Sequence, residues 1–318
     1  MRDQTISVII PTIGRPSSLE RLLASIAKQT YPVREVIVAD GSSDESTRNI
    51  VEDPRWRQED VFLEYLAVLP PDAVRQREMA IQIATGDWLL LLDDDVELEL
   101  GCVSNLVAAS RDFPEAVAVM ADFSNEPWAM PTRVWRFYLR FICGLQENEW
   151  QGRVVGPLLR YGFLSSQTAT VACQWFGTGN SLVSRDAFER AGGFSDFFLH
   201  RSSVNEDVDL SMKVARQGTL LFCPSAKLAH FHDPAGRVAP LQAAEDDLYN
   251  RYQILHRTMA RSAISAFGLC LLFFAIETLS NAMGGLLRWE WSHSVQLMRG
   301  RLSALWRICK GFGAAWSG

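Results

Sequence analysis

The sequence predicts an α/β fold in which helices cover both faces of a mostly parallel sheet, followed by a helical C-terminal tail. A strand at residues 6–10, a helix from about residue 17 and a second strand at 35–39 follow one another within forty residues. This order makes the two strands parallel, with a right-handed crossover. An unbroken apolar run, Trp88–Leu92, then leads into three consecutive aspartates, which is typical of a strand buried on both faces.

The other elements follow from local signals along the chain. Pro11 is expected to end the first strand, and Ser17 and Ser18 to begin a helix whose apolar residues recur at helical spacing. Gly86 ends a helix expected at 72–84. Further helices are expected at 46–53, 103–111, 186–191 and 206–217, and further strands at 61–66, 117–121 and 220–232.

Asp93, Asp94 and Asp95 stand at the carboxyl end of the apolar strand, where open α/β sheets bind their ligands. Adjacent carboxylates repel one another, and a hard divalent cation with oxygen ligands relieves that repulsion. An acidic turn that caps the next helix is the alternative. Three acids directly after a buried strand favour a metal site.

Composition and charge limit the functional classes. The 318 residues are 48% hydrophobic and 21% charged, a globular balance that allows one large domain or two. The net charge of −6 gives no reason to expect a nucleic-acid partner. Six cysteines without a C-x-x-C pair suggest neither a zinc site nor a disulfide framework. The strand–helix turns carry neither G-x-G-x-x-G nor G-x-x-x-x-G-K-[ST], which excludes the dinucleotide fingerprint and the P-loop.

The middle of the chain, residues 125–173, is irregular and rich in aromatic residues. We expect an insertion that forms one wall of a cleft, with plain packing against the sheet as the alternative. The aromatic residues concerned are Trp128, Trp135, Phe137, Tyr138, Phe141 and Trp150.

Residues 251–318 are expected to form a membrane-associated tail behind a main domain of residues 1–250. The tail has eight Lys and Arg against two acids, which leaves a net charge of −12 for the first 250 residues, and this asymmetry suits an anionic membrane. Residues 262–287 are long and apolar enough to span a bilayer, but Glu277 near their middle would be costly in hydrocarbon. Residues 293–312 mix apolar and basic side chains, as interfacial helices do.

We therefore expect a peripheral or re-entrant tail ahead of a true span. A helical cap that packs on the main domain or on a second subunit is the alternative. The N-terminal apolar stretch is too short for a signal peptide, so the expected location is the cytoplasm, at the cytoplasmic face of the membrane.

The motifs and their order resemble glycosyltransferase family 2, the inverting, nucleotide-sugar-dependent enzymes of the GT-A fold. The resemblance covers about residues 6–233. It rests on SVIIPTIGRPSSLERLLASIAKQTYPVREVIVADGSSDES, on Arg77 before ATGDWLLLLDDDV, and on GTGN, GGF, EDVDLSMKVARQG and HFH in that order. It implies a GT-A catalytic domain over residues 1–250 that transfers a sugar from a nucleoside-diphosphate sugar, of UDP or dTDP type, with Mg²⁺ or Mn²⁺.

The resemblance also implies roles for individual residues on the donor side. Asp40 would accept a hydrogen bond from the pyrimidine, and Asp94 would point toward the ribose. Asp93 and Asp95 would bind the metal. Thr12, Arg15 and Arg77 complete the donor-binding set, and His230 stands where some members place a third metal ligand, with His232 as a weaker candidate.

On the acceptor side, Asp207 matches the family's general base, which takes the proton of the attacking hydroxyl. Glu206 would orient the acceptor or the helix. Without the resemblance, these two acids are better explained as partners of a helix dipole. The segment that resembles the family's acceptor-side lining consists of Gly177, Thr178, Gly179 and Asn180.

The chain departs from the family pattern in two places. Glu78 follows Arg77 where many members have Asn, and no QxxRW motif is present, which argues for a single transfer rather than a processive polymerase. From the tail we expect a glycan or lipid-linked acceptor. Two other functions are left open: a sugar nucleotidyltransferase, for which TIGRPSS is a poor triphosphate loop, and a non-catalytic protein that binds a nucleotide or partner at the membrane.

Overall fold

The structure, a computed structural model, describes residues 4–56, 61–126, 130–146, 148–156, 159–162, 164, 167–199, 203–233, 238–288 and 291–316. Its contacts divide the chain into two compact units. Unit 1 comprises Met1–Trp128 and Leu164–Gly236, and unit 2 comprises Ala129–Phe163 and Arg237–Gly318. These compact units divide the chain at positions other than residue 250. The functional boundary expected at residue 250 stays a prediction.

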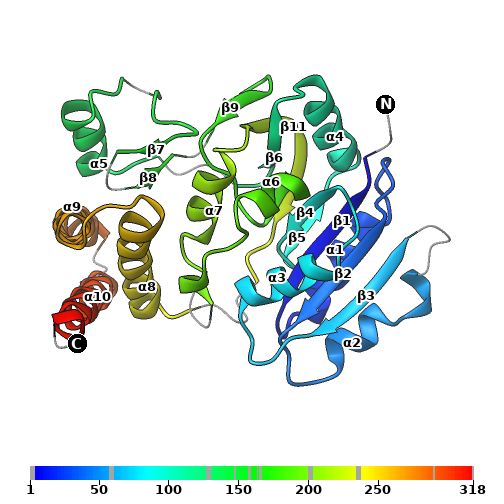
Figure 1. Ribbon diagram of the computed structural model, residues 1–318, viewed down its shortest axis with the longest axis horizontal. Helices are drawn as coiled ribbons and strands as arrows, with labels where there is room; N and C mark the ends of the chain where they lie inside the picture. Colours follow the sequence, from blue (N-terminus) through cyan, green and yellow to red (C-terminus); the bar gives the residue numbers. More distant parts are fainter. Residues whose placement is uncertain are drawn as a thin grey trace. The chain divides into compact units, whose positions relative to one another are not determined.

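Unit 1 is built on the expected mixed sheet, with strand order β3-β2-β1-β4-β10-β6-β11-β5 and with β9 beside β11 (Figure 1). The strands are β1 Ile6–Thr12, β2 Glu35–Asp40, β3 Phe62–Ala67, β4 Trp88–Leu92, β5 Val96–Leu98, β6 Ala116–Phe123, β9 Val171–Cys173, β10 Asn180–Ser184 and β11 Thr219–His230. The pairs β3–β2, β2–β1, β1–β4 and β6–β11 are parallel. Strand β10 is antiparallel to both β4 and β6, so β4 and β6 point the same way.

The helices of unit 1 begin and end close to where the local signals placed them. They are α1 Pro16–Ile26, α2 Ser46–Val51, α3 Ala73–Ile83, α4 Cys102–Asp112, α6 Arg185–Arg190 and α7 Glu206–Val214, with short 3₁₀ turns η1 Pro54–Trp56 and η3 Asp196–Phe198. Asp72 caps α3, because its side chain accepts hydrogen bonds from the backbone N–H groups of Val74 and Arg75. The apolar face of α1 packs into the same core as β1, β2 and β4.

The prediction that Pro11 ends the first strand is wrong. Strand β1 continues to Thr12, and Pro11 pairs with Ala39 of β2. The pairing of β1 with β4 ends at Ile9, and the Thr12 carbonyl accepts from Gly41 on the β2 side. Because successive residues of a strand face opposite neighbours, the nitrogen of Pro11 faces the side where β4 has already stopped pairing, and the ladder loses no hydrogen bond.

Unit 2 consists of α5 Arg133–Phe137, the π-helical turn η2 Tyr138–Ile142, the hairpin β7 Val154–Val155 with β8 Arg160–Tyr161, α8 Pro240–Gln253, the π-helical turn η4 Ile254–Thr258, α9 Ala263–Arg288 and α10 Trp291–Trp316. Helices α8, α9 and α10 pack on one another (Figure 1). A Cβ at Gly300 would lie 2.1 Å from the Leu241 carbonyl oxygen, so α10 can approach α8 this closely only because it has a glycine there.

Most of the aromatic segment, Ala129–Phe163, belongs to unit 2, and its expected place as a wall of a cleft stays a prediction. Trp135, Tyr138 and Trp150 are buried, and the Trp135 ring lies 5.8 Å from that of Phe273 in α9. Phe137 and Phe141 of the same segment are exposed, whereas Trp128 lies outside the described residues.

Helix α9 contains a stretch, Ala263–Met283, that is long and apolar enough to cross a membrane, and 22% of its most apolar window is buried. The acid in this helix is neutralised within unit 2. Glu277 accepts a hydrogen bond from Trp135 Nε1 at 2.7 Å and lies 3.4 Å from Arg301 Nη2. These partners reduce the cost that an isolated carboxylate would have in this helix.

Candidate active site

Strand β4 brings the aspartate triplet to the sheet edge at which β1 and β2 also end. Leu89 to Leu92 are fully buried, as expected for a central strand. Thr12 ends β1 directly opposite Asp40, which ends β2. The sequence placed these residues at one edge, and the structure agrees; their binding roles stay predictions.

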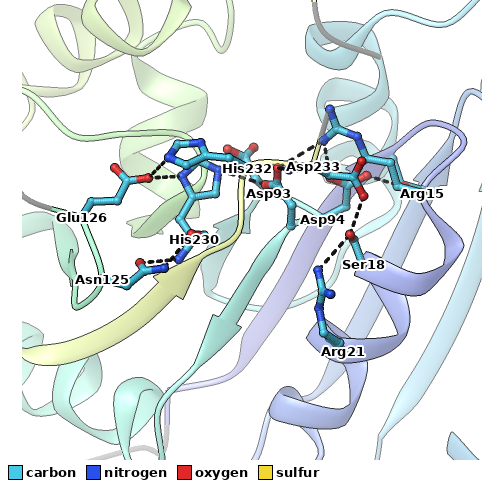
Figure 2. Close-up of polar contacts among 12 residues, drawn as sticks. Arg15, Ser18, Arg21, Asp93, Asp94, Asn125, Glu126, His230, His232 and Asp233 are labelled. Carbon is cyan, nitrogen blue, oxygen red and sulfur yellow. Dashed lines mark hydrogen bonds and ion pairs between the residues drawn. The ribbon is translucent and has the colours of Figure 1, made fainter. Parts of the chain in front are cut away.

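Asp94 is enclosed by protein groups. Its carboxylate accepts a hydrogen bond from Thr12 Oγ1 at 2.6 Å. It also accepts one from Arg15 Nη1 at 2.8 Å (Figure 2). Burial raises the pKa of Asp94 to about 6, although both partners act in the opposite direction. Three residues of the expected donor site are thus joined in one hydrogen-bonded group.

Asp95 is joined to the end of β11. Its Oδ1 lies 3.1 Å from His230 Nε2, and its Oδ2 accepts from the backbone N–H of Asp233 at 3.0 Å. Burial alone would raise the pKa of Asp95, but the hydrogen bond and charge of His230 outweigh it and hold the pKa below its ordinary value. Burial lowers the pKa of His230, and the hydrogen bond and charge of Asp95, with the charge of Glu126, raise it above the ordinary value.

Glu126 completes this group, and the sequence analysis did not include it. Its Oε1 lies 2.7 Å from His230 Nδ1 and also contacts His232 Nε2 (Figure 2). Asn125 fixes the backbone of His230 by accepting from its N–H at 2.8 Å and donating to its carbonyl at 2.7 Å. Glu126 follows the end of β6, so the signal that marked the triplet, an acid just beyond a buried parallel strand, was present here too.

The chemistry of these side chains fits a divalent cation. Asp93 and Asp95 offer carboxylate oxygens and His230 an imidazole nitrogen, which are ligand types that suit Mn²⁺. The potential ligand atoms of Glu126, His230 and His232 lie within 4.8 Å of one another. The carboxylate of Glu126 at Nδ1 leaves Nε2 of the same ring directed to Asp95, and a carboxylate in this position commonly orients a metal-binding histidine.

Arg77 connects the triplet to the acids of α7. It is 4% exposed, donates to Asp93 Oδ1 at 2.6 Å and lies 3.6 Å from Glu206 Oε1. Gly179 lies against the same carboxylate, because a Cβ there would be 2.2 Å from Asp93 Oδ2, and its carbonyl accepts from the Asp93 N–H at 3.2 Å. Arg77 was expected on the donor side and Gly179 on the acceptor side, and in the structure both contact Asp93.

Glu206 and Asp207 begin α7 as expected. Glu206 is buried and accepts a hydrogen bond from Thr178 Oγ1 at 2.9 Å. Burial, with the charge of Asp207, raises the pKa of Glu206 despite Arg77. Burial likewise raises the pKa of Asp207, to which the charge of Asp93 adds. Two carboxyl groups with raised pKa values and a buried arginine therefore lie beside the triplet.

Among the remaining predicted site residues, Asp40 and Asn180 form hydrogen bonds with other residues of the chain. Asp40 accepts hydrogen bonds from the backbone N–H and hydroxyl of Ser42 and from Tyr65, whose pKa is raised to about 12 by burial and this contact. Gly177 lies close to the Asn180 side chain, which donates to the Ala121 carbonyl at 2.7 Å. This segment runs antiparallel beside the end of β4, and its acceptor-side role stays a prediction.

The comparison with known families decides what kind of site this is. The model of glycosyl transferase family 2 matches residues 7–190, more than half of the chain. The chain belongs to glycosyl transferase family 2. It is therefore a glycosyltransferase, and the sugar nucleotidyltransferase alternative is set aside.

Curated relatives of this glycosyltransferase act on varied acceptors. It is 27% identical over 258 residues to the N-acetylglucosaminyl-diphospho-decaprenol L-rhamnosyltransferase of Mycobacterium tuberculosis, covering 74% of this chain and 80% of that one. It is 29% identical over 109 residues to the GalNAc(5)-diNAcBac-PP-undecaprenol beta-1,3-glucosyltransferase of Campylobacter jejuni. That match spans about a third of each chain, 34% of this one and 35% of the relative.

Solved structures confirm the GT-A fold. A mannosyltransferase from Pyrobaculum calidifontis, in complex with GDP-Man and Mn²⁺, superposes with a TM-score of 0.58 at 19% identity, over 96% of this chain and 88% of that one. GalNAc-T7 with UDP, GalNAc and Mn²⁺ superposes with a TM-score of 0.57 at 17% identity, over 81% of this chain and 51% of that one. These likenesses concern the fold of the glycosyltransferase.

Proposed function

We propose that the protein is a metal-dependent, inverting glycosyltransferase that moves one sugar per encounter from a nucleoside-diphosphate sugar to a hydroxyl of a lipid-linked or glycan acceptor. One observation carries the proposal. Arg77 bridges Asp93 of the triplet and Glu206 at the start of α7, so the proposed donor side and the proposed base stand in one continuous site.

On the donor side, Asp93, Asp95 and His230 would hold Mg²⁺ or Mn²⁺, which when bound neutralises the negative charge of the leaving diphosphate. Thr12, Arg15, Asp40 and Asp94 would bind the nucleoside, of UDP or dTDP type. Arg77 adds a buried positive charge next to Asp93. Two solved structures of this fold contain Mn²⁺ together with a nucleotide or nucleotide sugar.

On the acceptor side, the carboxylate of Asp207 takes the proton of the acceptor hydroxyl while its oxygen bonds to the anomeric carbon. The bond from that carbon to the phosphate oxygen breaks at the same time, and the nucleoside diphosphate leaves with the electron pair. A single displacement of this kind inverts the anomeric centre. Glu206, with its raised pKa and its bond from Thr178, positions the acceptor side of the site.

A membrane-held acceptor is supported by unit 2 and by the relatives. Two relatives are named for transfer to decaprenyl or undecaprenyl diphosphate glycans. The apolar stretch of α9 carries exposed Ile264, Leu271 and Leu279. We propose that residues 251–318 associate with the cytoplasmic face of a membrane, in a peripheral or re-entrant manner.

Asp207→Asn separates an enzyme from a protein that only binds nucleotide. The variant should lose sugar transfer while manganese-dependent nucleotide binding persists, because the amide cannot take the proton. Asp186→Asn, at an exposed acid of α6, is the matched control and should behave as the wild type. If wild type and both variants bind nucleotide but none forms product with any lipid-linked acceptor, the non-catalytic alternative is the better account.

A further inference from the structure

A cavity of about 490 Å³ in unit 2 is lined by arginine and apolar side chains from one short segment. Its lining comes from the chain between Met130 and Trp150, and the described residues of that lining include no acid. Helix α5 and the turn η2 supply three arginines to it, Arg133, Arg136 and Arg140.

No acid among the described residues offsets the charges of the three arginines. Within the described parts of the chain, none of their guanidinium groups has a carboxylate partner, and the guanidinium of Arg140 lies 5.6 Å from the ring centroid of Phe141. Like charges on one helical face repel one another, and an anion between them removes that repulsion. The planar guanidinium fork matches the oxygens of a phosphoryl group, which it binds with two parallel hydrogen bonds.

The apolar part of the lining indicates that the anion carries a hydrocarbon chain. Met130, Phe137 and Phe141 are 53%, 59% and 64% exposed. Large apolar side chains grouped on a surface in this way commonly mark a binding site. Inorganic phosphate would leave these side chains in water, whereas the first carbons of an attached lipid would cover them.

The opposite side of the segment is fixed to α9. Trp135 is 1% exposed and donates to Glu277 at 2.7 Å, and the hydroxyls of Thr132 and Ser280 are 2.7 Å apart. These contacts attach the segment that carries the arginines to α9, the helix with the exposed apolar stretch.

We propose that this cavity binds the diphosphate head of a lipid-linked acceptor, with Arg133, Arg136 and Arg140 on the phosphoryl oxygens and Phe137 and Phe141 against the first carbons of the lipid. The inference rests on the proposed function, because it assigns the class of acceptor to a place in unit 2. A general anionic bilayer is the rival occupant. A cavity with three arginines suits one compact headgroup better than it suits the many headgroups spread over the surface of an anionic bilayer.

The test is flotation of the full-length protein with three kinds of vesicle. Phosphatidylcholine vesicles contain geranylgeranyl diphosphate, phosphatidylglycerol of equal total charge, or no anionic lipid, and soluble pyrophosphate serves as a competitor. The variants are Arg136→Gln/Arg140→Gln and Arg136→Lys/Arg140→Lys. Arg153→Gln, at an exposed arginine of unit 2 outside the cavity, is the control.

The wild type should bind the diphosphate vesicles about tenfold or more tightly than the phosphatidylglycerol vesicles, and the double glutamine variant should lose that preference. The lysine variant should keep part of it, because a point charge remains, and the control should keep all of it. Equal binding to both anionic vesicles, or full competition by equimolar pyrophosphate, would overturn the proposal. Transfer by the wild type to a soluble glycan acceptor without a diphosphate tests the proposed function separately, so the two can fail independently.

Discussion

Replacing Arg77 by methionine should destabilise the fold far more than breaking an exposed ion pair. Arg77 is 4% exposed and faces two acids, Asp93 and Glu206. Removing one partner of a buried pair costs about 3–5 kcal/mol. Because the Asp93 side chain is 40% exposed and can regain water, we expect the lower end, about 3 kcal/mol of unfolding free energy. Arg48→Met is the matched control.

Arg48 pairs with Glu52 at 2.8 Å, but the two side chains are 49% and 58% exposed, so the loss of this pair should cost far less unfolding free energy than the loss of Arg77. The assay is urea unfolding followed by circular dichroism, with a chelator present. The penalty for Arg77→Met should also depend on pH. The folded-state pKa of Glu206 is raised by burial and Asp207, so its contribution to stability is present below its ordinary pKa and is lost as pH rises through the raised value.

Removing Arg77 raises the pKa of Glu206 further, which makes the loss larger at high pH. The deficit of Arg77→Met against the wild type should therefore be greater at about pH 8 than at about pH 5.5. Equal costs for Arg77→Met and Arg48→Met, or a deficit that grows as pH falls, would refute this account of the arginine.

Three further predictions concern the site itself. Gly179→Ala places a Cβ against Asp93 and should weaken manganese-dependent nucleotide binding, measured by calorimetry, about tenfold while thermal melting is retained; unchanged affinity would contradict the contact. Glu126→Ala frees His230 Nδ1 and should lower the affinity for Mn²⁺ about tenfold or more, whereas Glu99→Ala, at an exposed acid, should not. The acid limb of the transfer rate should lie above the ordinary aspartate pKa of about 3.9, because burial raises the pKa of Asp207; a limb at that value would argue against Asp207 as the base.

Much of unit 1 could be predicted because its signals are local. The unbroken apolar run of β4 reports burial on both faces, and its end places Asp93, Asp94 and Asp95 at the sheet edge. Asp72 marked the start of α3 through its side-chain cap, and Gly86 lies just beyond the end of this helix. Such features depend on residues close together in the sequence, so they can be predicted from one sequence alone.

The contacts that assemble the site could not be predicted, because they join residues far apart in sequence. Nothing local links Arg77 to Glu206, or Glu126 to His230. Pro11 continued in a strand because its neighbour β4 stopped pairing, which is a property of the sheet. The aromatic segment joined unit 2 through Trp135 and Glu277, a pairing across more than a hundred residues.

The most direct test of the central claim is titration calorimetry of UDP, dTDP and GDP, each with and without Mn²⁺, on the wild type and on Asp95→Ala. We predict tight, manganese-dependent binding of one nucleotide by the wild type and its loss in the variant, since Asp95 is joined to His230 at the proposed metal site. Failure of the folded wild type to bind any of the three nucleotides would contradict the proposed donor site.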